Sequence, residues 1–414
     1  MATVKPFKCI RPESSVCERV AALPYDVYNR SEAYEEVKRE PLSFLKVDRA
    51  ETSFDESVDT YDERVYLKAK ELLEGMINDG IYEQDVDDAY YIYEQIMDGR
   101  SQTGIVGCAS VDDYVNGIIK KHENTREDKE QDRIRHVDTC NAQTGPIFLA
   151  YRANTVISEV VKKTKEEQPI YDFTSVDGIR HIAWKISKTE DVTAVEKAFS
   201  DIPGVYIADG HHRAASAVKV GLKRRNECGE YTGTEQFNYF LSVLFPHDEL
   251  MIMDYNRTVK DLNGLTEEEF ISKLEENFVI IEKSEQEIKP AKKGEFSMYL
   301  SGTWYRCMAS EKLLNIEDPV KSLDVSLLQD YLLAPVLGIG DPRTDKRIDF
   351  IGGIRGLSEL VKRADGDMKV SFAMYPTSIE ELFAVADAGL LMPPKSTWFE
   401  PKLRSGMFIH SLSE

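Results

Sequence analysis

The 414-residue chain carries 73 acidic residues against 52 lysines and arginines, a formal net charge of −21, and its residues are 42% hydrophobic and 30% charged. This balance is typical of a folded globular protein, and the excess negative charge disfavours binding to nucleic-acid backbones. No apolar run reaches the roughly 18 residues of a membrane span, and six scattered cysteines form no C-x-x-C pair, so we expect a cytoplasmic protein with reduced thiols and no membrane partner.

Apolar periodicity and turn residues predict alternating helices and strands in the first part of the chain. The expected strands are 41–48, a hairpin of 89–97 with 104–111, 145–152, 178–186 and 204–210. The expected helices are 61–79, most of 111–140 with a break near 122–125, 155–167, and one that opens after Gly210. Thr125 and Asp128 have the spacing of a capping box at the helix start after that break.

The later part of the chain shows the same mixture, with strand-like segments such as 237–245, 295–302 and 370–376 between helical ones. We therefore expect a mixed α/β or α+β fold, with helices packed on mixed sheets. A boundary near residues 246–260 separates an N-terminal region, 1–250, from a C-terminal α/β region, 251–414.

The segment Tyr206–Val220, YIADGHHRAASAVKV, reads as a strand that breaks at a glycine and enters a helix. Cations on the first helical turn are disfavoured by the helix dipole unless an anion lies among them, and backbone N–H groups at such a junction commonly hold phosphate. Gly210, His211, His212 and Arg213 are therefore candidate phosphate-binding residues. The alternative is a helix capped by Asp209 with solvated histidines. A metal site is disfavoured, since adjacent histidines point in different directions and no third ligand is evident.

Two further segments are candidates for the same site. His122 and Glu123, in KHENT, precede a helix start, where a carboxylate can face a site; the alternative is a solvated helix start. The loop 392–406, MPPKSTWFEPKLRSG, is rigid and rich in donors, which suits an anion or substrate pocket, although it could instead be a C-terminal strap. Its candidate substrate-binding residues are Lys395, Ser396, Thr397, Lys402 and Arg404.

The box DGHHR resembles that of the ParB/sulfiredoxin superfamily, in which a strand–turn–helix junction holds nucleotide phosphates, over a core of about 90–220. Together with LPYDV, KHENT, DYNR and PPKSTWFEPKLRSG, it identifies the chain as similar to a large prokaryotic family of unknown function of the DUF1015 type. Sulfiredoxin chemistry is excluded because His211 stands where its cysteine would be. The negative charge and the strands after the helix argue against ParB-like DNA binding.

The remaining relatives are free serine kinases, whose upstream glutamate and D-G-H-x-R-like box match Glu123 and Asp209–Arg213 in order. This resemblance implies a kinase that uses ATP or ADP with Mg²⁺ on a small hydroxylated metabolite, with free L-serine as the favoured substrate. Asp209 or Glu123 would accept the hydroxyl proton, or Asp209 would help seat the metal. The alternatives are a nucleotide-hydrolysing switch and a non-catalytic binding protein; the oligomeric state stays open.

Overall fold

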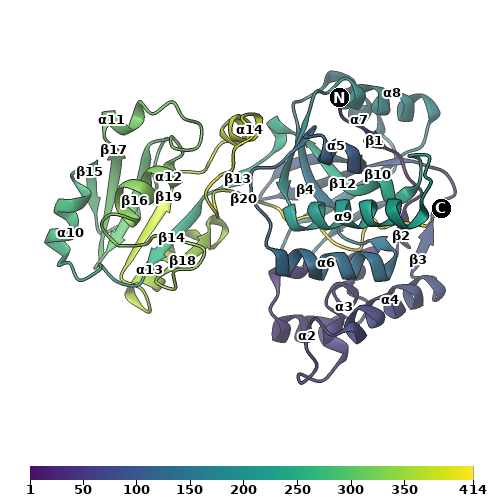
Figure 1. Cartoon of the computed structure of the whole chain (residues 1–414), viewed down its shortest axis with the longest axis horizontal. Helices are drawn as coiled ribbons and strands as arrows, with labels where there is room; N and C mark the ends of the chain where they lie inside the picture. The colour runs from purple at the N-terminus through teal and green to yellow at the C-terminus, as the bar shows by residue number, and fades with distance from the viewer. Residues whose placement is uncertain (414) are drawn as a thin grey trace. The chain divides into compact units, whose positions relative to one another are not determined.

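The computed structural model describes residues 1–413 and divides into two compact units, Met1–Leu250 with Pro401–Glu414, and Met251–Glu400 (Figure 1). Helices pack on sheets in both units, so the expected mixed α/β class is confirmed. Along the described chain, no helix is both long enough and apolar enough to cross a bilayer.

A nine-stranded mixed sheet forms the centre of the first unit, in the order β6-β11-β8-β12-β5-β4-β10-β9, with β1 paired to β5. Its strands are β1 (Val4–Lys5), β4 (Tyr90–Met97), β5 (Arg100–Ser110), β6 (Ile119–Lys120), β8 (Ile147–Tyr151), β9 (Tyr171–Thr174), β10 (Arg180–Ile186), β11 (Val205–Asp209) and β12 (Tyr239–Pro246). The pairs β6–β11 and β8–β12 are parallel, and the others are antiparallel. The expected hairpin is β4–β5.

The helices of the first unit are α1 (Cys17–Val20), α2 (Arg30–Arg39), α3 (Leu45–Asp48), α4 (Glu63–Asn78), α5 (Val111–Val115), α6 (Glu127–Cys140), α7 (Thr155–Thr164), α8 (Thr189–Ser200) and α9 (His211–Cys228). α9 lies beside α6, and α6 lies beside α4 (Figure 1). Ala214, Ala217 and Val218 of α9 are buried in one core with Ile207 and Leu149 of the sheet. This packing fixes the start of α9 against the end of β11.

Two local predictions in this unit are wrong. Residues 41–48 form no strand, because Phe44, Leu45 and Val47 are buried in a helical turn, α3, that packs beside α4. A short apolar run is compatible with either structure, and its neighbours decide. Thr125 and Asp128 make no capping box: the Thr125 hydroxyl donates to Glu130 Oε2 (2.7 Å), and α6 begins after Arg126 instead.

The C-terminal residues differ from the expected 251–414 region, since Pro401–Glu414 belong to the first unit. Within that unit, β21 (His410–Ser411) pairs with β7 (Ala142–Gln143), and the Tyr82 hydroxyl donates to the Gly406 carbonyl (2.7 Å). A further short pair joins β2 (Ile10–Pro12) to β3 (Tyr82–Gln84). The last residues are thus held by hydrogen bonds that the local sequence does not reveal.

A six-stranded antiparallel sheet forms the centre of the second unit, in the order β15-β17-β16-β19-β14-β18. Its strands are β14 (Tyr255–Val259), β15 (Phe278–Ser284), β16 (Glu295–Leu300), β17 (Thr303–Ala309), β18 (Ile348–Gly352) and β19 (Val370–Met374), and β13 (Ile252–Met253) pairs separately with β20 (Trp398–Phe399). Its helices are α10 (Glu267–Leu274), α11 (Glu311–Leu314), α12 (Asp324–Leu328), α13 (Gly356–Asp365) and α14 (Ile379–Asp387). Leu357 and Leu360 of α13 pack on the sheet around Trp304.

Candidate functional site

The junction between β11 and α9 has the strand–glycine–helix form that the sequence predicts. β11 ends at Asp209, and Gly210, with φ +90°, is the N-cap of α9. Glycine adopts this left-handed conformation at low cost, and it has no side chain to accept a hydrogen bond from the first helical turn. A Cβ at Gly210 would lie 3.1 Å from Arg213 Nε, so the guanidinium lies close against the turn. The N-terminal end of α9 therefore carries the helix dipole together with a fixed cation.

Asp209 is the half-buried anion at this junction. Its Oδ1 accepts a hydrogen bond from the Gly210 N–H (2.8 Å), and its Oδ2 accepts one from Lys402 Nζ (3.1 Å). Burial alone would raise the pKa of the Asp209 carboxyl, but the charges of Lys402 and Arg213 outweigh burial and hold that pKa well below its usual range. Asp209 is therefore ionised, and two cations accompany it.

Arg213 also fixes a neighbouring loop. Its Nη1 donates to the Pro146 carbonyl (2.6 Å), just before β8. A cavity of about 30 Å³ lies beside this contact, and its lining includes Tyr25, Arg133 and Thr144. Arg213 thus contributes both a hydrogen bond to the fold and a positive charge beside Gly210.

His122 and Glu123 are brought to this junction by the pairing of two strands distant in sequence. β6 and β11 are parallel, with Ile119 opposite Val205 and Lys120 opposite Tyr206. The residues that follow both strands therefore lie at the same edge of the sheet, where ligands commonly bind in α/β folds. Although 86 positions separate Glu123 from Asp209 along the chain, the fold places both segments together.

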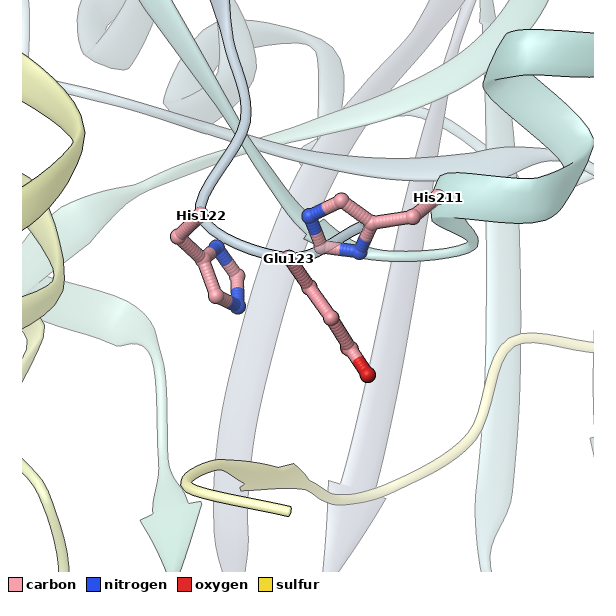
Figure 2. Close-up of side chains that lie close together, drawn as sticks. All are labelled: His122, Glu123 and His211. Carbon is pink, nitrogen blue, oxygen red and sulfur yellow. The ribbon is translucent and has the colours of Figure 1, made fainter. Parts of the chain in front are cut away.

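The imidazoles of His122 and His211 meet edge to face at this edge, with ring centroids 4.5 Å apart and the side chain of Glu123 beside them (Figure 2). Burial lowers the pKa of His122 to about 4, and burial together with the neighbouring imidazole lowers the pKa of His211 well below its usual value. Both rings are therefore neutral near pH 7. No local signal in the sequence reveals the β6–β11 pairing, so the sequence predicts no role for His122.

His212 lies in a different environment from His211. Its Nε2 accepts a hydrogen bond from the Arg126 backbone N–H (3.0 Å), at the start of α6, and burial lowers its pKa. The ring is thus used to connect α9 to α6. That His212 binds nucleotide stays a prediction.

The five residues predicted to bind substrate fall into three environments. Lys402 reaches Asp209, whereas Arg404, 4% exposed, donates to Asp177 Oδ2 (2.5 Å), His181 Nε2 (3.2 Å) and Ser175 Oγ (2.9 Å). The Arg404 guanidinium is therefore committed to a buried network within the first unit and does not accompany Lys402.

Lys395, Ser396 and Thr397 belong to the second unit. Lys395 is exposed, with φ +60°, and its Nζ lies 5.5 Å from the centroid of the Tyr255 ring. Ser396 is buried; its hydroxyl donates to the Pro393 carbonyl (2.6 Å). That these three residues close over a substrate stays a prediction.

Comparisons with solved structures find weak similarity. A free serine kinase in complex with AMP is 16% identical, with 72% of this chain and 86% of that chain covered and a TM-score of 0.34. SbnI with a C-terminal truncation, from Staphylococcus aureus, is 11% identical, with 71% of this chain and 82% of that chain covered and a TM-score of 0.38. A conserved hypothetical protein from Pyrococcus furiosus is 15% identical, with 73% of this chain and 93% of that chain covered and a TM-score of 0.33. We infer neither fold nor activity from likenesses at these TM-scores.

The search of curated proteins finds no match. The resemblance of Asp209–Arg213 to the ParB/sulfiredoxin box stays a prediction. A family model described as "Protein of unknown function (DUF1015)" matches residues 4–326, well over half of the chain. The chain therefore belongs to the DUF1015 family.

Proposed function

We propose that this protein is a nucleotide-dependent kinase that transfers a phosphoryl group to the hydroxyl of a small metabolite, with free L-serine as substrate and O-phosphoserine as product. The observation that carries the proposal is the start of α9, where Gly210 leaves the first turn without a side-chain cap and Arg213 and Lys402 flank the carboxylate of Asp209. Phosphoryl transfer requires positioning and charge neutralisation rather than covalent chemistry, and these groups can supply both.

The phosphates of ATP or ADP would bind at the N-terminal end of α9. Backbone N–H groups of the first turn attract anions, and Arg213 adds a charged donor of fixed geometry. The close approach of the guanidinium to Gly210 explains why a side chain there would obstruct the site. Arg213 and the turn are thus the groups on which nucleotide affinity should depend.

The acceptor hydroxyl would lie near the carboxylates. Either Asp209 or Glu123 would take its proton, and Asp209 would help seat Mg²⁺, whose preferred ligands are oxygens. In the structure, Lys402 and Arg213 lower the pKa of Asp209 and make it a weak base. Phosphates that attract the same two cations would weaken this effect and return the carboxylate toward its ordinary basicity.

The choice of L-serine rests on the resemblance of the Glu123 and Asp209–Arg213 motifs to those of free serine kinases. The test is to incubate the full-length protein and Mg²⁺ with ATP, ADP or CTP and a panel of hydroxylated amino acids. Mass spectrometry would detect a phosphorylated product, and phosphate release would be followed in parallel. We expect O-phosphoserine from one nucleotide. Nucleotide hydrolysis without a phosphorylated product would favour the switch instead. If the protein neither phosphorylates a substrate nor hydrolyses a nucleotide, the proposal is overturned.

A further inference from the structure

The cluster of His122, Glu123 and His211 has a feature that the kinase proposal does not use. Each residue offers one ligand atom, and the three atoms lie within 4.8 Å of one another (Figure 2). His122 is 2% exposed and His211 is 6% exposed. Among residues 1–413, neither His122 Nδ1 nor His211 Nε2 has a hydrogen-bond partner. Buried polar atoms without a partner are rare and costly, so two in contact call for an explanation.

The hydrogen bonding of His122 fixes which nitrogen is available. The His122 ring makes a hydrogen bond to the Ile207 backbone, and this bond raises the pKa of the ring. A hydrogen bond has this effect when the ring donates it, so the acceptor is the Ile207 carbonyl. Since Nδ1 has no partner among the described residues, Nε2 is the donor, and a neutral ring then carries a lone pair on Nδ1. Metal-bound histidines are typically oriented in this way, by donation from the second nitrogen to a carbonyl.

We propose that His122 Nδ1, His211 Nε2 and the Glu123 carboxylate bind one divalent first-row transition-metal ion, such as Zn²⁺ or Mn²⁺. Two imidazoles and one carboxylate are a donor set typical of these metals, whereas Mg²⁺ prefers oxygen ligands alone. The site is therefore distinct from the Mg²⁺ that would accompany the nucleotide. The neutral state of both imidazoles is the state that binds metal.

The position of the cluster suggests what the metal would do. Three protein ligands leave at least one coordination position open for water or another oxygen ligand. His211 is the first residue of α9, so the open position would be near the start of that helix. In the proposed kinase, a substrate or phosphate oxygen could occupy that position. Metal binding itself does not depend on the kinase proposal, because it can be measured without nucleotide.

The test is metal binding by full-length protein that has been stripped with a chelator. Titration with Zn²⁺ in a metal buffer should give one tight site per chain, and Co²⁺ should give d–d absorption without the thiolate charge-transfer band that cysteine ligation produces. Loss of a ligand should cost more than the 10–100-fold that loss of a supporting hydrogen bond typically costs. We therefore expect His122→Ala and His211→Ala each to weaken Zn²⁺ binding at least about 100-fold.

Matched variants separate ligands from neighbours. Glu123→Gln should weaken Zn²⁺ binding and alter the Co²⁺ spectrum, whereas His212→Gln, on the same helical turn, should leave both unchanged. Circular dichroism would check folding, and the Co²⁺ spectrum of the unmodified protein requires no variant at all. The inference would be overturned if the protein had no stoichiometric Zn²⁺ site or if the Co²⁺ spectrum contained a thiolate band. It would also be overturned if His122→Ala and His211→Ala kept full affinity for Zn²⁺. A metal site without serine phosphorylation would reject only the kinase, and phosphorylation without a metal site would reject only this inference.

Discussion

Two partly buried carboxylates, one in each unit, each accept a hydrogen bond from a glycine N–H, but their pKa values are shifted in opposite directions. Asp209 Oδ1 accepts from the Gly210 N–H (2.8 Å), and Asp324 Oδ1 accepts from the Gly294 N–H (2.9 Å). Lys402 and Arg213 hold the pKa of Asp209 well below its usual range, whereas burial raises the pKa of Asp324 to about 7.

The difference lies in the charges around each carboxylate. Glu381 and Glu295 lie near Asp324 and raise its pKa further, whereas the hydrogen bond from the Gly294 N–H and the charge of Lys293 lower it. Asp209 has two cations and lies at a turn that a ligand could enter. Perturbed pKa values are common at functional sites but also arise in structural ion pairs, so the evidence for a site at Asp209 is its place at the start of α9 and not its pKa.

The largest expected effect comes from removing the charge of Asp209. Asp209→Asn keeps an oxygen for the Gly210 N–H but loses the anion beside Lys402. In the serine kinase assay, we expect kcat to fall by roughly 10²–10⁴, the usual contribution of a positioned carboxylate. Glu123→Gln should also lose turnover if both carboxylates line one site. Full activity in Asp209→Asn, with an unchanged melting temperature, would return Asp209 to a purely structural role.

Removing Arg213 should weaken nucleotide binding. A charge-assisted hydrogen bond contributes about 1.5–3 kcal/mol, so Arg213→Ala should raise the nucleotide Kd about 10- to 150-fold by calorimetry. The same change deletes the bond to Pro146, which should lower the free energy of unfolding by about 1 kcal/mol. Arg213→Lys is the control that retains charge. Unchanged nucleotide affinity in Arg213→Ala would contradict the phosphate-binding role.

A smaller effect is expected at Lys395. If the predicted substrate-binding role of Lys395 is correct, Lys395→Ala should raise the serine KM about 2- to 5-fold, the range of an exposed ion pair. Lys395→Arg should retain the wild-type KM. The melting temperature should stay the same, because Lys395 is exposed and alanine has the same backbone constraint at φ +60°. A large melting shift with normal kinetics would favour a structural strap.

Local sequence signals predicted the elements of the site better than its assembly. The glycine at 210 follows from turn chemistry, and the β4–β5 hairpin follows from two β-rich runs separated by the turn-forming segment DGRSQTG. The family is confirmed by a model that matches residues 4–326, a range that includes LPYDV, KHENT, DGHHR and DYNR but not PPKSTWFEPKLRSG.

Long-range pairings were not accessible from local patterns. Neither the parallel alignment of β6 with β11 nor the contact of Lys402 with Asp209, 193 residues apart, leaves a signal in either segment alone. The same limit explains Arg404, whose flanking sequence resembles that of Lys402 but whose partners, Asp177 and His181, lie in a distant strand and turn. The sequence of this loop shows that it contains many hydrogen-bond donors, but it does not show which partner each donor binds.

A separate expected effect, on stability and not on activity, is a pH dependence in the second unit. With a folded pKa of about 7 and an unfolded value near 3.9, Asp324 binds more protons in the folded state between those pH values. Its stabilising contribution is therefore full below about pH 4 and is lost as the pH rises toward 7, so the free energy of unfolding should fall over that interval.

Asp324→Asn keeps an acceptor for the Gly294 N–H and cannot titrate, so it should remove this slope. Denaturant titrations of the full chain at pH 5, 6, 7 and 8, followed by tryptophan fluorescence, would measure it. The control is Asp341→Asn: the hydrogen bond from Arg343 holds the pKa of Asp341 at about 2, so that carboxyl stays ionised across the interval. An equal slope in wild type and Asp324→Asn would show that the pKa of Asp324 is not raised in the folded state, and the contrast with Asp209 would then fail.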